Sequence, residues 1–448
     1  MLKRILPNLG FILQFYGIFV IIPAYLALIL NEIPCAISFF ITATVSLATG
    51  FLLNIFSERI SLSIRDAFVL FFLTYLVLGI IGIIPFLYLE MFGPLSLNSA
   101  INSFFESVSG FTTTGFTLIK NPEILPKSFV LYRSLTQFVG GIGIVYISLS
   151  FLYSHRPRAL KRLSRVFEFK ERVSEIKSIF LSILLVYSIL VVISSLLVYP
   201  YFHDFFNSLV FSLSAVSTGG FTPIQEIQIS SHTLLLCIPM IFGAINFTLY
   251  FRWRDANDLL KRSFFMFFLL LIILFILEFT LIGNFEHSIF YTVSALTTSG
   301  FKIRHTFSEP EKFFLSLFML IGGMTVSTAG GIKVERVLSI IDQIPKMFKE
   351  KIWGVEEKVD TYPLLLFLLF LIAFLFSVSF FTLSNYDLGD SFLISASALS
   401  TSGITPSNLI FSLSSEQKLF LSFIMILGRV EIVPFLLVFV KPKISNKI

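Results

Sequence analysis

The sequence of 448 residues contains few charged residues, few cysteines and few histidines. Asp, Glu, Lys and Arg make up 13% of the chain and hydrophobic residues 56%. A typical soluble domain has about 25% charged residues, so this shortage excludes the soluble class and indicates a polytopic membrane protein. The two cysteines, Cys35 and Cys237, lie in apolar stretches, where we expect them to pack. The five histidines form no HExxH motif and no GxSxG motif occurs, so we do not expect an enzyme.

Long apolar runs occur along the whole chain and predict ten membrane spans. A hydrocarbon core requires about 20 apolar residues. The first run, Phe11 to Leu30, has full span length and lacks a small-residue cleavage site, so no cleavable signal peptide is expected. The ten expected spans are Asn8 to Leu30, Ala36 to Phe56, Asp66 to Phe92, Ser128 to Leu152, Ile176 to Tyr201, His232 to Tyr250, Lys261 to Leu281, Lys312 to Ser339 and beyond, Thr361 to Leu383, and Gln417 to Val440.

Basic residues are distributed unevenly between the two sets of connections. Most of the 33 Lys and Arg residues precede the first span or lie in every second connection, above all in segments 154–177 and 333–358. Cytoplasmic loops are enriched in these residues, so an even number of spans places both termini in the cytoplasm. The net charge of +6 is therefore a signal of topology, and nucleic acid is not an expected partner.

A polar segment occurs four times, always in a connection predicted to lie outside the cytoplasm. Each copy has a helix-compatible stretch too short to span a bilayer, then a Ser/Thr-rich tetrad closed by glycine. Each copy is expected between two full spans, so the chain is four repeats preceded by two extra helices. The copies are NSFFESVSGFTTTGFT (Asn102 to Thr117), NSLVFSLSAVSTGGFT (Asn207 to Thr222), HSIFYTVSALTTSGFK (His287 to Lys302) and DSFLISASALSTSGIT (Asp390 to Thr405). The expected divisions are 1–57 for the leading helices and 58–153, 154–251, 252–351 and 352–448 for the repeats.

These segments have the properties of a cation site. Half-helices beginning at Asn102, Asn207 and Asp390, which are good N-cap residues, would direct their negative C-terminal ends at the membrane centre. Non-helical backbone is tolerated there only when it is buried or lines a cavity. Glycine permits positive φ, so that successive carbonyl groups can point at one axis and replace the water of an ion. The alternative is close helix packing by small residues, which explains one such cluster better than four aligned copies.

These repeats, together with four further motifs, give a resemblance that covers nearly the whole chain. The motifs are TQFVGGIGIVYI (Thr136 to Ile147), GAINFTLYF (Gly243 to Phe251), GGMTVSTAGGIKVER (Gly322 to Arg336) and GRVEI (Gly428 to Ile432). The sequence resembles the TrkH/KtrB superfamily of bacterial potassium-uptake proteins, and the TrkH branch in particular. The resemblance implies a potassium pore in one subunit of a membrane homodimer, controlled by a cytosolic ring of nucleotide-binding TrkA-like regulatory subunits. It implies potassium as the transported ion and no organic cofactor on this chain.

The resemblance also implies which residues contact the ion. The selectivity filter would consist of Thr113, Thr114, Gly115, Thr218, Gly219, Gly220, Thr298, Ser299, Gly300, Thr401, Ser402 and Gly403. Its innermost ring would consist of Thr112, Ser217, Thr297 and Ser400. The four loops differ chemically, and Ile404 stands where the other repeats have Phe. Potassium is therefore the expected ion, and passage of some sodium is an alternative that the sequence leaves open.

The eighth predicted span is interrupted by GGMTVSTAGG. Gly322, Gly323, Gly330 and Gly331 each cost about 1 kcal/mol relative to alanine in a helix, so this stretch should be unwound. It resembles the intramembrane gating loop of the family, with Lys333 at its cytoplasmic end. The alternative is a glycine-rich helix crossing. A phosphate-binding loop is discarded, because Val334 follows Lys333 and no strand precedes the segment.

Arg429 lies in the middle of the last predicted span. A central arginine costs about 2.5–3.5 kcal/mol on insertion, and such residues usually face a cavity or a partner. We expect Arg429 to reach the pore below the filter, where its charge forms an electrostatic barrier. The alternative is a structural pair with a carboxylate such as Glu278 or Glu106. Glu106 also matches a family position, and the sequence does not assign it a role.

The expected function is potassium uptake across the bacterial cytoplasmic membrane through a channel-like filter, gated by the interrupted span and by a cytosolic partner. Two alternatives stay open: a proton- or sodium-coupled potassium symporter, and a weakly selective potassium/sodium pore. A coupled transporter favours inverted repeats, whereas these four repeats share one orientation. A purely structural scaffold leaves the fourfold polar segment unexplained.

Overall fold

The computed structural model describes residues 2–55, 64–154, 172–230, 232–252, 256, 258–303, 306–353 and 362–430. Within these ranges the regular structure is helical and no β-strand occurs. Six helical segments are long and apolar enough to cross a membrane, and many of their large apolar side chains are exposed, as expected of surfaces that face lipid. These segments are Ile5–Ile29, Ile33–Ile55, Val69–Tyr88, Leu181–Phe202, Asp258–Ile282 and Pro363–Leu383.

The other four predicted spans differ in outcome. One is a continuous helix, α6 (Lys127–Ser154). The span predicted at His232 to Tyr250 is wrong as a continuous helix: it is divided into a 3-10 turn, α10 (Cys237–Ala244) and α11 (Phe247–Arg252). The span from Lys312 is interrupted as predicted, between α14 (Glu309–Ile321) and α15 (Val334–Trp353). The last span begins as α19 (Ser415–Arg429), and its continuation beyond Val430 lies outside the described residues, as does most of the basic segment 154–177.

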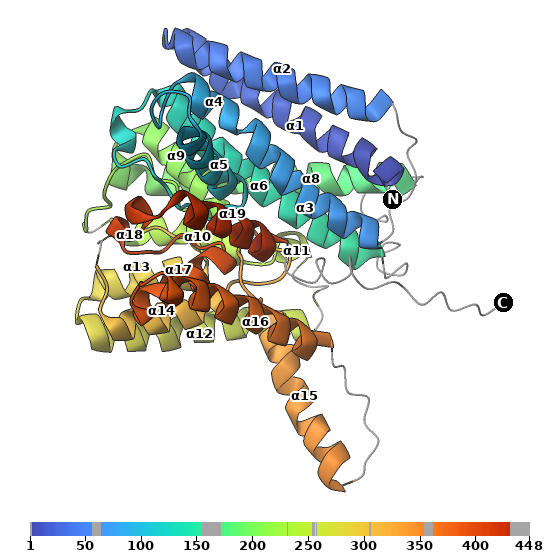
Figure 1. The fold of residues 1–448 in the computed structure, drawn as a ribbon. Helices are drawn as coiled ribbons and strands as arrows, with labels where there is room; N and C mark the ends of the chain where they lie inside the picture. Colours follow the sequence, from blue (N-terminus) through green and yellow to red (C-terminus); the bar gives the residue numbers. More distant parts are fainter. Residues whose placement is uncertain are drawn as a thin grey trace, which may run out of the picture.

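The two leading helices form a hairpin that is hydrogen-bonded to the first repeat. These helices are α1 (Leu2–Ile29) and α2 (Ile33–Ile55), which lie side by side in Figure 1. Their backbones approach closely at two glycines, since a Cβ atom on Gly10 would lie 2.6 Å from the carbonyl oxygen of Gly50. The carboxylate of Glu32 accepts hydrogen bonds from the backbone N–H groups of Lys127 and Ser128, at 2.9 and 3.0 Å. Glu32 thereby supplies acceptors for the exposed N–H groups that begin α6.

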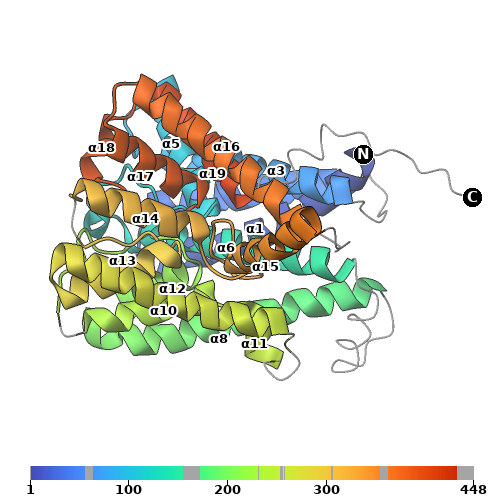
Figure 2. The same cartoon turned by 90° about the horizontal axis from the view of Figure 1, so that it is seen from below.

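Each repeat contains a short half-helix between two membrane segments. The half-helices are α5 (Leu97–Phe111), α9 (Phe205–Val216), α13 (Phe285–Leu296) and α17 (Leu388–Leu399). The segments that precede them are α3 (Ile64–Ile81) with α4 (Ile83–Tyr88), α8 (Arg172–Phe202), α12 (Asp258–Ile282) and α16 (Tyr362–Leu383). In Figure 2 the second repeat (green) and the fourth (orange to red) lie on opposite sides of the molecule, as a fourfold arrangement requires.

The half-helices begin earlier than predicted. Asn102, Asn207 and Asp390 all lie within helices, so their assignment as N-cap residues was wrong. The residues at the N-cap positions are Ser96, Asp204, Asn284 and Asp387. Polar residues suited to capping are clustered in each of these connections, and the end of the preceding span decides which of them begins the half-helix.

Candidate functional site

The four loops that follow the half-helices share one backbone conformation. Each loop starts with the residue that ends its half-helix, which keeps right-handed helical angles. The second and fourth residues have positive φ. We call residues 112–115, 217–220, 297–300 and 400–403 the repeat loops; positive φ occurs at Thr113, Gly115, Thr218, Gly220, Thr298, Gly300, Thr401 and Gly403. Positive φ is uncommon outside glycine, and its occurrence at the same threonine of every loop was not anticipated from the sequence.

Contacts between the repeat loops close a ring in the order of the chain. Each loop glycine packs against the carbonyl oxygen of the residue before the glycine of the next loop, and leaves no space for a Cβ atom. The pairs are Gly115 with Gly219, Gly220 with Ser299, Gly300 with Ser402, and Gly403 with Thr114. The fourth loop thus returns to the first. Segments that are distant in the sequence form one continuous rim of backbone at the ends of four half-helices.

The hydroxyl groups at the inner end of the ring are oriented alike. Each donates a hydrogen bond of 2.5–2.7 Å to the carbonyl oxygen four residues earlier in its own half-helix. The four residues are Thr112, Ser217, Thr297 and Ser400. Three of these carbonyl groups also accept the backbone N–H of the same residue, as Val108 does from Thr112 at 2.8 Å, so the hydroxyl bond adds to a helix bond. Three of the hydroxyl oxygens have a further polar partner: Thr112 pairs with Thr114, Ser217 with Tyr187 and Thr297 with Ser299. Because a hydroxyl oxygen has two lone pairs, each keeps some acceptor capacity.

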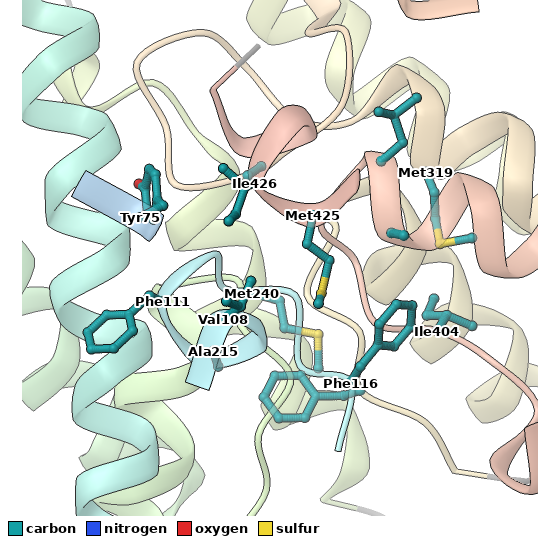
Figure 3. Close-up of a cluster of buried hydrophobic side chains, with 14 of the residues drawn as sticks. Tyr75, Val108, Phe111, Phe116, Ala215, Met240, Met319, Ile404, Met425 and Ile426 are labelled. Atoms are coloured by element: carbon teal, nitrogen blue, oxygen red, sulfur yellow. The ribbon is translucent and has the colours of Figure 1, made fainter. Parts of the chain in front are cut away.

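The side chains after the loop glycines turn into the surrounding core. Phe116, Phe221, Phe301 and Ile404 are all buried. The ring of Phe116 stacks with that of Phe105 at a centroid distance of 6.2 Å, and Phe301 packs against Phe211 of the second repeat at 4.5 Å. Figure 3 shows Phe116 and Ile404 in one apolar cluster with Met425 and Met240. Apolar packing in the surrounding core therefore stabilises the position of the loops.

The interrupted span forms a loop that lies directly against the inner end of the ring. We call residues 322–331 the glycine-rich loop. The N–H of Gly330 donates to Thr298 Oγ1 at 2.7 Å, and a Cβ atom on Gly330 would collide with the carbonyl oxygen of Ser400. Thr328 Oγ1 donates to the carbonyl oxygen of Val216, the last residue of α9, at 2.9 Å. The glycine-rich loop thus contacts the second, third and fourth repeats.

The break in the second repeat holds the glycine-rich loop in place. The N–H of Met324 donates to the carbonyl oxygen of Ala244 and the N–H of Phe247 to that of Val326, both at 3.0 Å. These bonds replace the helix bonds that both segments lose at their breaks. The predicted unwinding at Gly322 to Gly331 is confirmed by the structure, whereas the matching break near Ile245 was missed. Asn246, a polar residue that follows Gly243 within the apolar run, was an available signal.

Arg429 is buried, and its guanidinium donates hydrogen bonds to backbone carbonyl groups. Its Nη1 donates to the carbonyl oxygen of Thr328 at 2.7 Å and its Nη2 to that of Gly140 at 3.3 Å. Of the carboxylates considered as partners, Glu106 instead binds Arg133. Lys333 is also buried, and its Nζ donates to the carbonyl oxygen of Ala329. Two cationic side chains therefore bind carbonyl groups of the glycine-rich loop.

A buried ion pair braces the first repeat loop. Glu106 Oε1 accepts hydrogen bonds from Arg133 Nη2 at 2.9 Å and from Thr117 Oγ1 at 2.7 Å. Its Oε2 accepts from the N–H of Leu118 at 2.8 Å. The guanidinium of Arg133 also lies over the ring of Phe221, 4.2 Å from the centroid. The pair joins the first half-helix to its outgoing loop and to the second repeat.

Gln137 was missed by the sequence analysis although it lies within one of the quoted motifs. Its Nε2 donates to the carbonyl oxygen of Gly219 at 2.6 Å, and its Oε1 accepts from the N–H of Phe221 at 3.3 Å. This fully buried amide holds both sides of the second repeat loop. A glutamine in the middle of an apolar span was the only sequence signal.

Comparison with known proteins identifies relatives over most of the chain. The family model described as "TrkH: Cation transport protein" matches residues 35–257 and 280–448. An uncharacterized cation transporter of Methanocaldococcus jannaschii is 29% identical, with 98% of this chain and 95% of that protein covered. The Trk system potassium uptake protein TrkG of Escherichia coli is 26% identical, with 96% of both covered, and TrkH of Halomonas elongata is 28% identical over 76% of this chain and 75% of its own.

The fold also matches a solved structure. The crystal structure of the potassium transporter TrkH from Vibrio parahaemolyticus superimposes with a TM-score of 0.82 at 23% identity, and 98% of each chain is covered. This likeness confirms the predicted fold class, an all-α polytopic membrane protein with four repeats of span, half-helix, loop and second membrane segment, preceded by two extra helices. The division of the second membrane segment in the second repeat is the correction to that prediction.

Proposed function

Because the chain belongs to the TrkH family of cation transport proteins, we propose that it takes up potassium ions across the cytoplasmic membrane through the ring of repeat loops. Membership in a family of membrane cation transporters also confirms that the chain is not an enzyme. The observation that carries the proposal is the closed order of contacts from the first loop through the fourth and back to the first. Such a ring surrounds one axis and offers oxygen atoms from four sides, which a dehydrated cation requires.

The expected filter residues supply these oxygen atoms in successive layers. Four half-helices end at the ring, and their aligned dipoles make this end attractive to a cation. The inner hydroxyl groups donate back into their helices, and each oxygen has two lone pairs. Acceptor capacity for an ion is therefore left even where Thr114 or Ser299 binds the same oxygen. Potassium is proposed because relatives carry names as potassium uptake proteins and because carbonyl rings of this kind suit potassium. The chemical differences among the loops make sodium the ion against which selectivity must be tested.

We further propose that the glycine-rich loop is the gate. It lies against Thr298 and Ser400 at the inner end of the ring, where an ion leaving the filter would pass. Arg429 and Lys333 bind its carbonyl groups, so positive charge stands next to the proposed exit. A shift of the loop would remove both the backbone and the nearby charge from the path. This extends the expectation that Arg429 forms an electrostatic barrier below the filter.

Assembly and control are part of the same proposal. The family resemblance favours a homodimer in the bacterial cytoplasmic membrane, with both termini in the cytoplasm and a ring of cytosolic TrkA-like nucleotide-binding subunits. In Figure 1, α15 projects from the body of the protein, and it begins directly after the glycine-rich loop. A regulatory protein bound to α15 would act on the loop through one continuous helix.

Cation flux into proteoliposomes of the purified chain tests the function. We expect uptake of potassium and rubidium to exceed that of sodium, and to persist without a proton or sodium gradient. Flux that requires either gradient would favour a coupled symporter, and equal sodium flux would favour the weakly selective pore. Absence of flux for all three ions, in vesicles where a known ionophore works and with the TrkA-like subunit added, would contradict the proposal.

A further inference from the structure

Lys302 is the one charged residue among four equivalent positions outside the ring. Two residues beyond each loop glycine, the chain has Thr117, Thr222, Lys302 and Thr405. The threonines of the first two repeats bind within their own repeats: Thr117 Oγ1 donates to Glu106, and Thr222 Oγ1 to the carbonyl oxygen of Ile224. The lysine behaves differently, because it reaches into another repeat.

The ammonium group of Lys302 binds across the boundary between the third and fourth repeats. Its Nζ donates to the carbonyl oxygen of Thr405 at 3.2 Å. This carbonyl belongs to the equivalent position of the neighbouring repeat, so the ammonium lies at the level of the outer rim. A lysine ammonium is a compact cation of unit charge, and a carbonyl oxygen is the kind of ligand that an entering potassium ion would use.

Solvent exposure is uneven around the rim, and the covered side is the side of Lys302. Gly115 and Gly220 of the first two loops are partly exposed to solvent. Gly300 and Gly403 of the last two loops are buried, and Thr405 is fully buried. Lys302 itself is partly buried. The rim is therefore more exposed at the first two repeats than at the last two, which are the two repeats that Lys302 joins.

The Lys302 side chain is partly buried and partly exposed to solvent. Burial lowers the pKa of the Lys302 ammonium to about 8. At the same time the side chain keeps contact with solvent, so it is not sealed in the core. At neutral pH the group is mainly protonated.

We propose that the Lys302 ammonium is a tethered cation at the outer mouth of the filter, which occupies the carbonyl oxygen of Thr405 in the fourth repeat and competes with the entering ion. The proposal rests on the proposed function of the repeat loops. It predicts that Lys302 sets the external concentration at which uptake is half-maximal, while the selecting carbonyl groups further in are unchanged.

Replacement of Lys302 by the residue of the other repeats tests this competition. In rubidium uptake by proteoliposomes, Lys302→Thr should lower the apparent KM by about fivefold, the factor for two unit charges about 4 Å apart in water. Lys302→Met should lower it similarly, because it removes the charge while keeping the length, and Lys302→Arg should resemble the wild type. Lys127→Thr, which removes another lysine expected outside the cytoplasm, is the matched control and should leave KM unchanged.

A cysteine at position 302 allows the charge of this side chain and its accessibility from outside to be tested in one protein. The native cysteines, Cys35 and Cys237, are both buried, so Lys302→Cys introduces a single accessible thiol. A cationic methanethiosulfonate reagent added outside should restore the wild-type KM, whereas an anionic reagent should lower KM further. Equal effects of the two reagents, or no reaction from the outside, would overturn the proposal.

Two results would separate this inference from the function on which it rests. Suppose that the wild type conducts, and that Lys302→Thr has the same KM but yields less folded protein. Lys302 then contributes only to the stability of the fold, and the inference is wrong. If the wild type conducts no cation at all, the proposed function itself fails.

Discussion

Arg429 Nη1 donates a hydrogen bond of 2.7 Å to the carbonyl oxygen of Thr328, and this bond joins the last described helix to the middle of the glycine-rich loop. Both residues are buried. The same guanidinium also binds the carbonyl oxygen of Gly140 in α6. The fourth repeat, the first repeat and the proposed gate are thus linked through one side chain, which explains why a costly arginine stands at membrane depth.

We predict that Arg429→Ala raises potassium flux per folded molecule and weakens its control by the cytosolic partner. A hydrogen bond to a charged group contributes about 1.5–3 kcal/mol, enough to shift the position of the loop about tenfold or more. Arg429→Lys should have a smaller effect, because it keeps the charge. The measurement is rubidium uptake normalised to the monodisperse fraction of purified protein. Unchanged normalised uptake with a poor yield would show that Arg429 serves stability alone.

Substitution of a loop glycine should reduce selectivity. Gly115→Ser and Gly403→Ser place a Cβ atom against the carbonyl oxygen of the neighbouring loop, at positive φ. We expect a higher sodium-to-rubidium flux ratio, because the carbonyl ring must deform. Gly283→Ser is the matched control: it also has positive φ, yet open space surrounds it. If both loop variants keep the wild-type ratio, these loops are not the filter.

Shortening the glycine-rich loop should abolish gating without loss of selectivity. Deletion of Met324 to Ala329 removes the residues that bind Ala244, Phe247 and Arg429, whereas the repeat loops stay intact. We expect high flux that no longer responds to the cytosolic partner or its nucleotide, with an unchanged sodium-to-rubidium ratio. The assay compares uptake with and without the partner. A folded deletion variant that still opens and closes would exclude this loop as the gate.

Val326 gives a second test of the gate, because its φ of 56° is unfavourable for a β-branched residue. Such strain costs about 1–3 kcal/mol, and Val326→Gly would remove it. The observed loop position should become more stable, so flux should fall. Val326→Ala removes side-chain packing but keeps an unfavourable backbone, and should not lower flux. Equal flux in the two variants would mean that backbone strain has no part in gating.

The effects of substituting Glu106 and Arg133 on stability should depend strongly on one another. Removal of one partner of a buried pair costs about 3–5 kcal/mol, because the other charge stays buried and unpaired. Arg133→Met should therefore lower the melting temperature in detergent markedly, and Glu106→Gln in the same chain should restore part of it. The four proteins of this double-mutant cycle are compared by thermal unfolding. Additive losses would show that the two residues act independently.

The sequence by itself determined the membrane class, the fourfold repeat and the unwound segment at Gly322 to Gly331. These features depend on local chemistry: the length of apolar runs, the recurrence of a Ser/Thr-Gly tetrad, and the helix-breaking tendency of glycine. The positions of the loop glycines were predictable for the same reason. Local chemistry did not select the helix starts, since several capping residues compete in each connection and Ser96 was chosen over Asn102.

Only the tertiary structure decided which groups meet. The order of the ring, in which Gly403 of the fourth repeat packs on Thr114 of the first, depends on how the repeats are arranged in space. The break near Ile245 exists because its backbone groups find partners in the glycine-rich loop, and those partners are distant in sequence. Likewise, Arg429 binds carbonyl groups and Lys302 binds Thr405, and backbone carbonyls carry no sequence signal. Contacts of this kind follow from the packing of whole repeats, which composition and periodicity do not specify.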